Sequence, residues 1–119
     1  MFYKIENWNI KEEGAESQII IDPAHPLFKG HFPQIPILPG ACMVQLTHHL
    51  TEKYLNRKMT FIKAVQIKFM AMVNPEKTPL LKSNFKIKGL EDNTYRVDHQ
   101  LAFDEIICFK ISAFYTYNA

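Results

Sequence analysis

The feature that most constrains the fold is a period-two alternation of apolar and polar residues that fills most of the second half of the chain. It divides into four stretches: residues 61–69, 80–88, 95–103 and 107–115. Alternation of this kind is typical of antiparallel strands that bury one face and expose the other. Short breaks rich in Pro, Gly, Asp and Asn separate the stretches, at lengths that suit hairpins. The pattern therefore predicts four consecutive antiparallel strands.

One helix is predicted ahead of these strands, at residues 40–56. Its apolar stripe has spacings of three and four residues and comprises Met43, Leu46, Leu50 and Tyr54. Such spacing places the stripe on a single helix face that packs against a core. Ala41, Cys42 and Val44 also make the first turns apolar on every side, so we expect this end of the helix to be buried.

Two further strands are predicted before the helix, at residues 2–12 and 16–22, with a turn at 13–15. One helix and several strands with one apolar face each have a simple packing solution, in which the sheet curls around the helix. We therefore predict an α+β fold, an antiparallel β-sheet wrapped around one long central helix, with residues 1–119 as a single domain. A long strand at the edge of such a sheet favours an edge-to-edge dimer.

Composition excludes several classes of function. A formal net charge of +2, without a basic run interleaved with aromatic residues, argues against nucleic-acid binding. No apolar run reaches the length of a membrane span, and the N-terminal residues lack a signal-peptide pattern, so we expect a cytoplasmic protein. Cys42 and Cys108 are expected to be buried free thiols. We find no glycine-rich phosphate loop and no metal-ligand spacing, and expect neither a cofactor nor a metal.

The candidate catalytic residues lie in the stretch from Gly30 to Gln45, which reads GHFPQIPILPGACMVQ. Prolines recur at intervals of three residues in this stretch, at Pro33, Pro36 and Pro39. They disfavour both a helix and the hydrogen bonding of a β-strand before Gly40, where the helix is predicted to begin. The loop is therefore stiff and delivers His31 towards the helix N-terminus. There the N–H groups around Gly40 and Ala41 favour negative charge. A base beside such amides is a workable catalytic pair.

The pattern GHFPxxPxxPG followed by a mostly apolar helix resembles the signature of the 3-hydroxyacyl-acyl carrier protein dehydratases, which have the hot-dog fold. The match is dense over residues 27–46, and the strand pattern on either side agrees with that fold. The resemblance implies that His31 removes the α-proton of a 3-hydroxyacyl thioester, while the backbone N–H of Gly40 polarises the thioester carbonyl. It also implies an active site at a dimer interface, with Phe32 and Pro33 holding His31. Ala41 and His49 complete the expected substrate-binding residues.

The chain departs from that family at one catalytic position. Fourteen residues after the histidine the family carries Glu or Asp, which protonates the leaving hydroxyl group, and here that position is Gln45. An amide can hydrogen-bond to the hydroxyl group, but it cannot act as a general acid near neutral pH. Loss of a positioned acid typically costs about 10²–10⁴ in rate.

Three accounts of this departure stay open. In the first, another group supplies the proton, and His49 is the best-placed substitute, with His48 and Glu52 also on the helix. In the second, His31 works alone, first as base and then as acid. In the third, the chain binds acyl thioesters without dehydrating them, as the silent partner of a competent paralogue.

We therefore predict a dehydratase-like protein that converts 3-hydroxyacyl thioesters to trans-2-enoyl thioesters in fatty acid or polyene- or polyketide-like lipid biosynthesis. The alternatives are an acyl-carrier-binding subunit without activity and a hot-dog acyl thioesterase. The expected partners are an acyl carrier protein with a phosphopantetheine-linked acyl chain and a second copy of the chain, as a homodimer or a larger oligomer built from dimers. A basic rim suited to the acidic carrier comprises Lys29, Arg57, Lys63, Lys68 and Arg96.

Overall fold

The computed structural model describes residues 1–29 and 36–118 of the chain. Within these residues the chain forms six strands, one α-helix and one short 3-10 helix. In chain order they are β1 (Tyr3–Lys11), β2 (Gly14–Ile21), η1 (Pro26–Phe28), α1 (Gly40–Leu55), β3 (Thr60–Phe69), β4 (Leu80–Gly89), β5 (Thr94–Phe103) and β6 (Ile106–Thr116). All six predicted strands and the predicted helix are present, with small differences at their ends.

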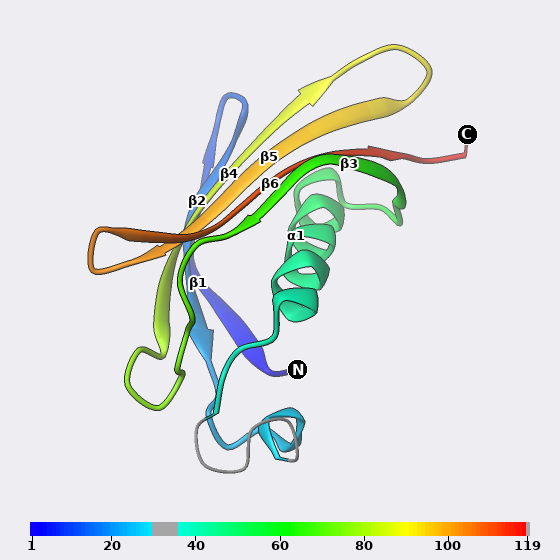
Figure 1. Cartoon of the computed structure of the whole chain (residues 1–119). Helices are drawn as coiled ribbons and strands as arrows, with labels where there is room; N and C mark the ends of the chain where they lie inside the picture. Colours follow the sequence, from blue (N-terminus) through cyan, green and yellow to red (C-terminus); the bar gives the residue numbers. More distant parts are fainter. Residues whose placement is uncertain (30–35, 119) are drawn as a thin grey trace.

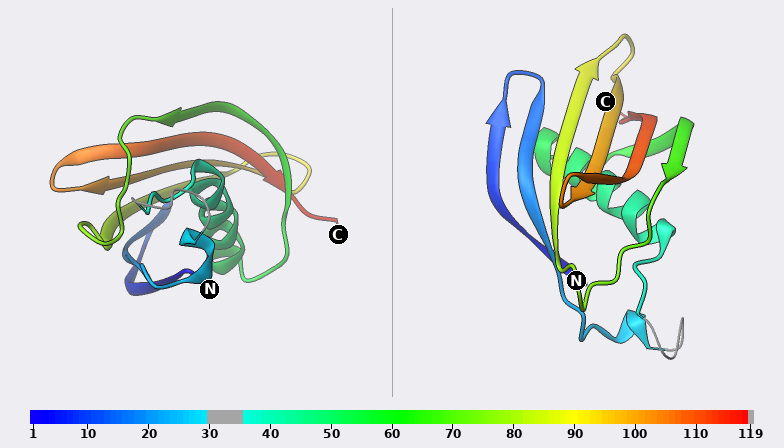
Figure 2. Two further views of the ribbon diagram at one scale, coloured as in Figure 1. Left: turned by 60° about the horizontal axis from the view of Figure 1, so that its bottom comes forward. Right: turned by 60° about the vertical axis from the view of Figure 1, so that its left-hand side comes forward.

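The six strands form one antiparallel sheet in the order β1-β2-β4-β5-β6-β3. The sheet is strongly curved, and α1 lies on its concave side (Figure 1). The views in Figure 2 show β1 and β3 at opposite borders of the sheet, with the connection through α1 joining the two halves. The predicted arrangement, an antiparallel sheet wrapped around one helix, is confirmed.

The core lies between the inner face of the sheet and one face of α1. The helix contributes Met43, Leu46 and Leu50, each at most 3% exposed, so three of the four residues in the predicted stripe are buried. The strands contribute the inward positions of the alternating pattern: Ile19, Ile21, Leu81, Phe85, Val97, Leu101, Phe109, Ile111 and Tyr115. Period-two alternation in the strands and three-to-four spacing in the helix therefore meet in a single core.

Two local features explain where the predicted boundaries differ. Strand β2 begins at Gly14, inside the predicted turn, because Gly14 has a φ of 155° and packs directly on β4. A Cβ atom at this position would lie 2.0 Å from the carbonyl oxygen of Phe85, so only glycine fits. In β1 the alternation is irregular because the register shifts between Glu6 and Asn9, with Asn7 at a φ of 54°.

Strand β3 differs from the prediction of a buried apolar face. Its large apolar side chains at the predicted positions are well exposed, with Phe61 at 43%, Val65 at 54%, Ile67 at 40% and Phe69 at 55%. The strand pairs with β6 and forms one edge of the sheet, so its other side has no neighbouring strand among the described residues. The alternation predicts the strand, but at this edge of the sheet α1 leaves much of the apolar face of β3 exposed.

The first turns of α1 also differ from expectation, because they are not buried all round. Ala41 is exposed, and Cys42 and Val44 are only half-buried. Cys42 and Val44 still pack against the core, and all three side chains contribute to an apolar surface along the helix. Across residues 1–29 and 36–118, no helix combines the length and apolar character that crossing a membrane requires.

Candidate functional site

A groove of about 730 Å³ runs along the part of α1 that the sheet leaves uncovered. One wall is apolar and comprises Ala41, Cys42, Val44, Phe61 and Tyr115. The polar lining comprises Gln45, His48, His49, Glu52 and Lys58. A concave site with a mainly apolar lining and a few convergent polar groups is the usual form of a small-molecule site.

The groove begins at the N-terminal end of α1, where backbone amides are available. Pro39 is the N-cap residue and offers no side-chain hydrogen bond, while the amide of Cys42 bonds the carbonyl of Pro39 at 3.0 Å. Within the described residues, the amides of Gly40 and Ala41 have no hydrogen-bond partner. A Cβ atom on Gly40 would lie 2.7 Å from the ring of Phe69, so glycine lets β3 close against the helix start.

Three of the predicted site residues, His31, Phe32 and Pro33, lie outside the described residues. The position of His31 relative to the helix start therefore stays a prediction. The described residues that follow the loop are tied to the fold, since the amide of Leu38 bonds the carbonyl of Val73 at 2.9 Å. Leu38 is itself buried, which anchors the approach to Pro39 and Gly40.

The structure brings the other predicted site residues together. Ala41, Gln45 and His49 follow one another at intervals of four residues, so they lie on one face of α1 and all line the groove. Gly40 starts the same helix. Gln45 is exposed, and its amide is therefore accessible to a ligand in the groove.

His49 is tied to the first strand of the sheet. The hydroxyl oxygen of Tyr3 lies 2.7 Å from His49 Nδ1, and the two rings are stacked with centroids 6.0 Å apart. Burial lowers the pKa of His49, the neighbouring charges of His48 and Lys58 also lower it, and Glu52 opposes them. The imidazole is therefore predominantly neutral near pH 7, and a neutral imidazole is a weak proton donor.

Glu52 is committed to other contacts. Its Oε2 atom accepts a hydrogen bond from the amide of Met59 at 2.8 Å and lies 3.3 Å from His48 Nε2. Burial acts to raise the pKa of Glu52, but the Met59 hydrogen bond and His48 outweigh it, and the net pKa is lowered. A carboxylate held in its ionised form does not supply a proton near neutral pH.

Sequence reasoning missed two tyrosines at this site. Tyr3, discussed above, and Tyr115 both occupy inward strand positions and carry no signal that separates them from core residues. Tyr115 is fully buried, and its hydroxyl has no partner among the described residues. Its ring lines the groove and meets the ring of His48 edge-on at 5.4 Å. Burial raises the pKa of Tyr115 to about 12, so its phenol stays protonated.

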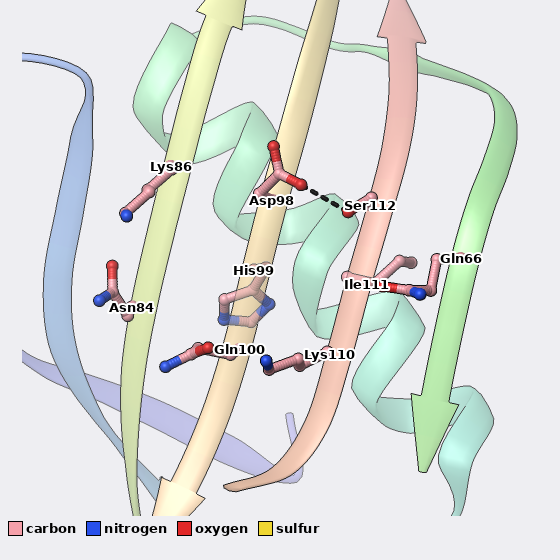
Figure 3. Close-up of a pocket in the computed structure, with 9 residues that line it drawn as sticks. All are labelled: Gln66, Asn84, Lys86, Asp98, His99, Gln100, Lys110, Ile111 and Ser112. Atoms are coloured by element: carbon pink, nitrogen blue, oxygen red, sulfur yellow. Dashed lines mark hydrogen bonds between the residues drawn. The ribbon is translucent and has the colours of Figure 1, made fainter.

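A second hollow, of about 290 Å³, lies on the opposite, outer face of the sheet (Figure 3). Its lining is mainly polar side chains of β4, β5 and β6 that face away from α1, and the Asp98 carboxylate already accepts hydrogen bonds from Ser112 and Arg96. His99 borders the hollow only through its strand, because its ring bonds Thr47 of α1 on the inner face. In the described part of the chain, no three His, Cys, Asp or Glu side chains are arranged as metal ligands. The groove along α1 is therefore the better candidate site.

Comparisons with known proteins agree with this architecture. A family model described as ApeI-like, ApeI dehydratase, matches residues 7–105. The chain is similar to one chain of a solved structure, the dehydratase heterocomplex ApeI:P from Xenorhabdus doucetiae, with 18% sequence identity and a TM-score of 0.82. The alignment covers 98% of this chain and 100% of that one. No curated protein sequence matches the chain.

Two other solved structures are similar over most of their length. Cj0977, a sigma28-regulated virulence protein from Campylobacter jejuni, is 12% identical with a TM-score of 0.72, covering 98% of this chain and 84% of that one. A putative thioesterase from Ralstonia eutropha, described as related to phenylacetic acid degradation, is 12% identical with a TM-score of 0.69, covering 97% and 84%. At these identities the likeness shows the shared hot-dog fold.

Proposed function

The chain belongs to the ApeI-like dehydratase family, and from this premise we propose that it eliminates water from 3-hydroxyacyl thioesters to give enoyl thioesters. One observation carries the proposal: the helix that follows the GHFP motif forms one side of an apolar groove. Gln45, at the position of the family's acidic residue, and His49 both line that groove. An acyl chain suits the apolar wall, and the polar residues suit the two oxygens of a 3-hydroxyacyl thioester.

In the proposed reaction His31 removes the proton from C2 of the substrate. The amide of Gly40 stabilises the negative charge that develops on the thioester oxygen, an effect worth roughly 3 kcal/mol in comparable sites. The C–H electron pair then becomes the C2–C3 double bond as the C3–O bond breaks. His31 returns its proton to the departing oxygen, which leaves as water. Phe32 and Pro33 hold His31, and Ala41 borders the bound thioester.

The proposed reaction uses His31 alone because three groove residues of α1, Gln45, His49 and Glu52, are poorly suited as proton donors. Glu52 is held in its ionised form by Met59 and His48. The lowered pKa of His49 leaves little imidazolium at neutral pH. Gln45 can orient the 3-hydroxyl group by hydrogen bonding but has no proton to give. We therefore expect a slower enzyme than one with an acidic residue at this position.

The proposed carrier of the substrate is an acyl carrier protein, presented by its phosphopantetheine arm. Lys58 lines the groove and carries a positive charge next to the helix end, and Arg57 precedes it in an exposed position. Positive charge at the entrance attracts an acidic carrier and the phosphate of the arm, and raises the association rate.

A second copy of the chain is the proposed partner. Strand β3 has an unpaired edge among the described residues, and its apolar side chains are 40–55% exposed at five positions. An exposed apolar edge strand of this length is normally covered by another chain. Pairing of two β3 strands would continue the sheet through both copies and bring the groove of one copy near the other.

A second candidate function is an acyl-carrier-binding subunit that acts only inside a heterocomplex. Gln45 favours it, since the usual proton donor is lacking in this chain. The dehydratase from Xenorhabdus doucetiae is itself described as a heterocomplex. In that case the exposed β3 edge would pair with a different chain of the same fold.

The test is turnover of a 3-hydroxyacyl-acyl carrier protein by the purified chain, followed by mass spectrometry of the acyl group. We expect an enoyl product that disappears in a His31→Ala variant. Equal product from the two proteins would exclude His31 as the base. Release of free carrier thiol would indicate a thioesterase. Activity that arises only on co-purification with another hot-dog chain would favour the heterocomplex.

A further inference from the structure

We propose that Tyr3 is a positioning residue that holds His49 in the tautomer with its proton on Nε2, so that His49 offers a neutral N–H donor to an oxygen of the bound acyl thioester. The ligand in this inference rests on the proposed function. The tautomer does not, because it is a property of the chain without ligand.

The contact joins the first strand of the sheet to the central helix. Tyr3 is on β1 and His49 on α1, 46 residues apart in the chain. The hydroxyl oxygen of Tyr3 lies 2.7 Å from Nδ1, and the rings are inclined by only 28°. Tyr3 is 6% exposed and His49 is half-buried, so the hydrogen bond is partly shielded from water. Both a short hydrogen bond and ring stacking therefore restrict the orientation of the imidazole.

The direction of this hydrogen bond follows from the donors and acceptors present. In residues 1–29 and 36–118 His49 Nδ1 is the one side-chain partner of the Tyr3 hydroxyl. If Nδ1 carried the proton, it would donate to the phenol oxygen, and the phenol O–H would be buried without an acceptor, which is costly. With the O–H donating to Nδ1, that proton is satisfied. A neutral imidazole whose Nδ1 accepts must carry its proton on Nε2.

Nε2 is then the nitrogen that remains for a ligand. His49 lines the groove one helical turn beyond Gln45, which also lines it. The Gln45 side-chain amide and His49 Nε2 are thus two N–H donors on one face of the helix. Two donors at this spacing fit a ligand with two acceptor oxygens, such as the hydroxyl and carbonyl of a 3-hydroxyacyl thioester. His49 contributes a hydrogen bond and transfers no proton.

The tautomer is tested by ¹⁵N-detected long-range correlation spectra of the histidine rings at pH 7. In the wild-type chain we expect an unprotonated Nδ1 and a protonated Nε2 for His49. In Tyr3→Phe we expect a mixture of tautomers. Tyr54→Phe is the control, because Tyr54 is a half-buried tyrosine of α1 whose hydroxyl contacts, among the described residues, only the carbonyl of Glu12, at 3.5 Å. A proton on Nδ1 in the wild-type chain would overturn the proposal.

The donor role is tested with 3-hydroxybutyryl-pantetheine. We expect its addition to shift the His49 Nε2 signal, and Tyr3→Phe to lower kcat/KM about tenfold, while Tyr54→Phe leaves it unchanged. His49→Gln keeps an amide N–H near the position of Nε2, so adding Tyr3→Phe to that variant should have no further effect. An unshifted Nε2 signal, or equal losses from Tyr3→Phe in both backgrounds, would refute the donor role. A shifted signal without any turnover would instead refute the proposed dehydration.

Discussion

Thr47 on α1 and His99 on β5 are joined by a hydrogen bond of 2.7 Å between Thr47 Oγ1 and His99 Nδ1. Thr47 donates its own proton to the carbonyl of Met43 at 3.0 Å, so its oxygen accepts from Nδ1–H. On the other side, Ser83 Oγ lies 2.8 Å from Nε2 and donates to it. A neutral His99 therefore links the helix to two strands with both ring nitrogens paired, in the middle of the core.

The buried His99 makes the stability of the chain sensitive to acid. Burial lowers the pKa of His99 to about 3, from 6.5 for an exposed histidine. Because the unfolded chain takes up the proton first, the stabilisation is complete above pH 6.5 and is lost as the pH falls from 6.5 towards 3. The free energy of unfolding in urea should fall by up to about 1.4 kcal/mol per pH unit in this window.

A His99→Gln variant provides the comparison, since glutamine lacks the titration. Its free energy of unfolding should depend less steeply on pH between 6.5 and 4.5, whatever its stability at pH 7. If the variant does not fold, an NMR titration of the wild-type ring gives the same information. A His99 ring that becomes protonated near pH 6 would contradict the assignment.

Ser83 and Ser17 are register partners on β4 and β2, and they offer a matched pair of substitutions. Ser83→Ala should destabilise the chain by about 1–3 kcal/mol, because it leaves a buried ring nitrogen of His99 without its donor. Ser17 is also buried, but its hydroxyl has no partner among the described residues. Ser17→Ala should therefore be neutral or stabilising. Chemical denaturation of both variants measures the difference, and equal losses would show that the His99 contact is unimportant.

The apolar edge of β3 should control the oligomeric state. Ile67→Lys places a charge among the exposed apolar residues of this strand and should weaken the dimer by at least tenfold in Kd. Ile10→Lys is the control, because Ile10 is 63% exposed on β1, the opposite edge strand. Sedimentation equilibrium of the three proteins distinguishes them. A monomeric wild-type chain at micromolar concentration would refute the homodimer.

Gln45→Glu should increase the dehydration rate, because it restores a proton donor at the position that the family uses. Gains of up to about 10²–10⁴ are expected for a well-placed general acid. Gln45→Met has nearly the same size but no hydrogen-bonding group, and should lower the rate below that of the wild type. Single-turnover assays compare the three proteins. If the rate of Gln45→Glu is at or below the wild-type rate, the missing general acid does not limit the reaction of the wild-type chain.

Much of the fold follows from local patterns. The alternation in residues 80–88 and 95–103 identified β4 and β5 within a residue at each end, and Pro39-Gly40 marked the start of α1, because these signals depend on neighbours in the chain. The motif also identified Gln45 as the position at which this chain departs from the acidic residue of the family. The geometry of His31 remains a prediction, since it lies outside the described residues.

By itself the sequence determined which residues form strands and helix, which faces are apolar, and which family the motif resembles. Only the tertiary structure decided that β3 is an uncovered edge, that the first turn of α1 borders a groove, and that Tyr3 meets His49. Periodicity shows which residues share a face of a helix or strand, but it does not show which other elements pack against that face. Contacts between residues 46 or 52 positions apart, such as Tyr3–His49 and Thr47–His99, depend on the order of strands in the sheet.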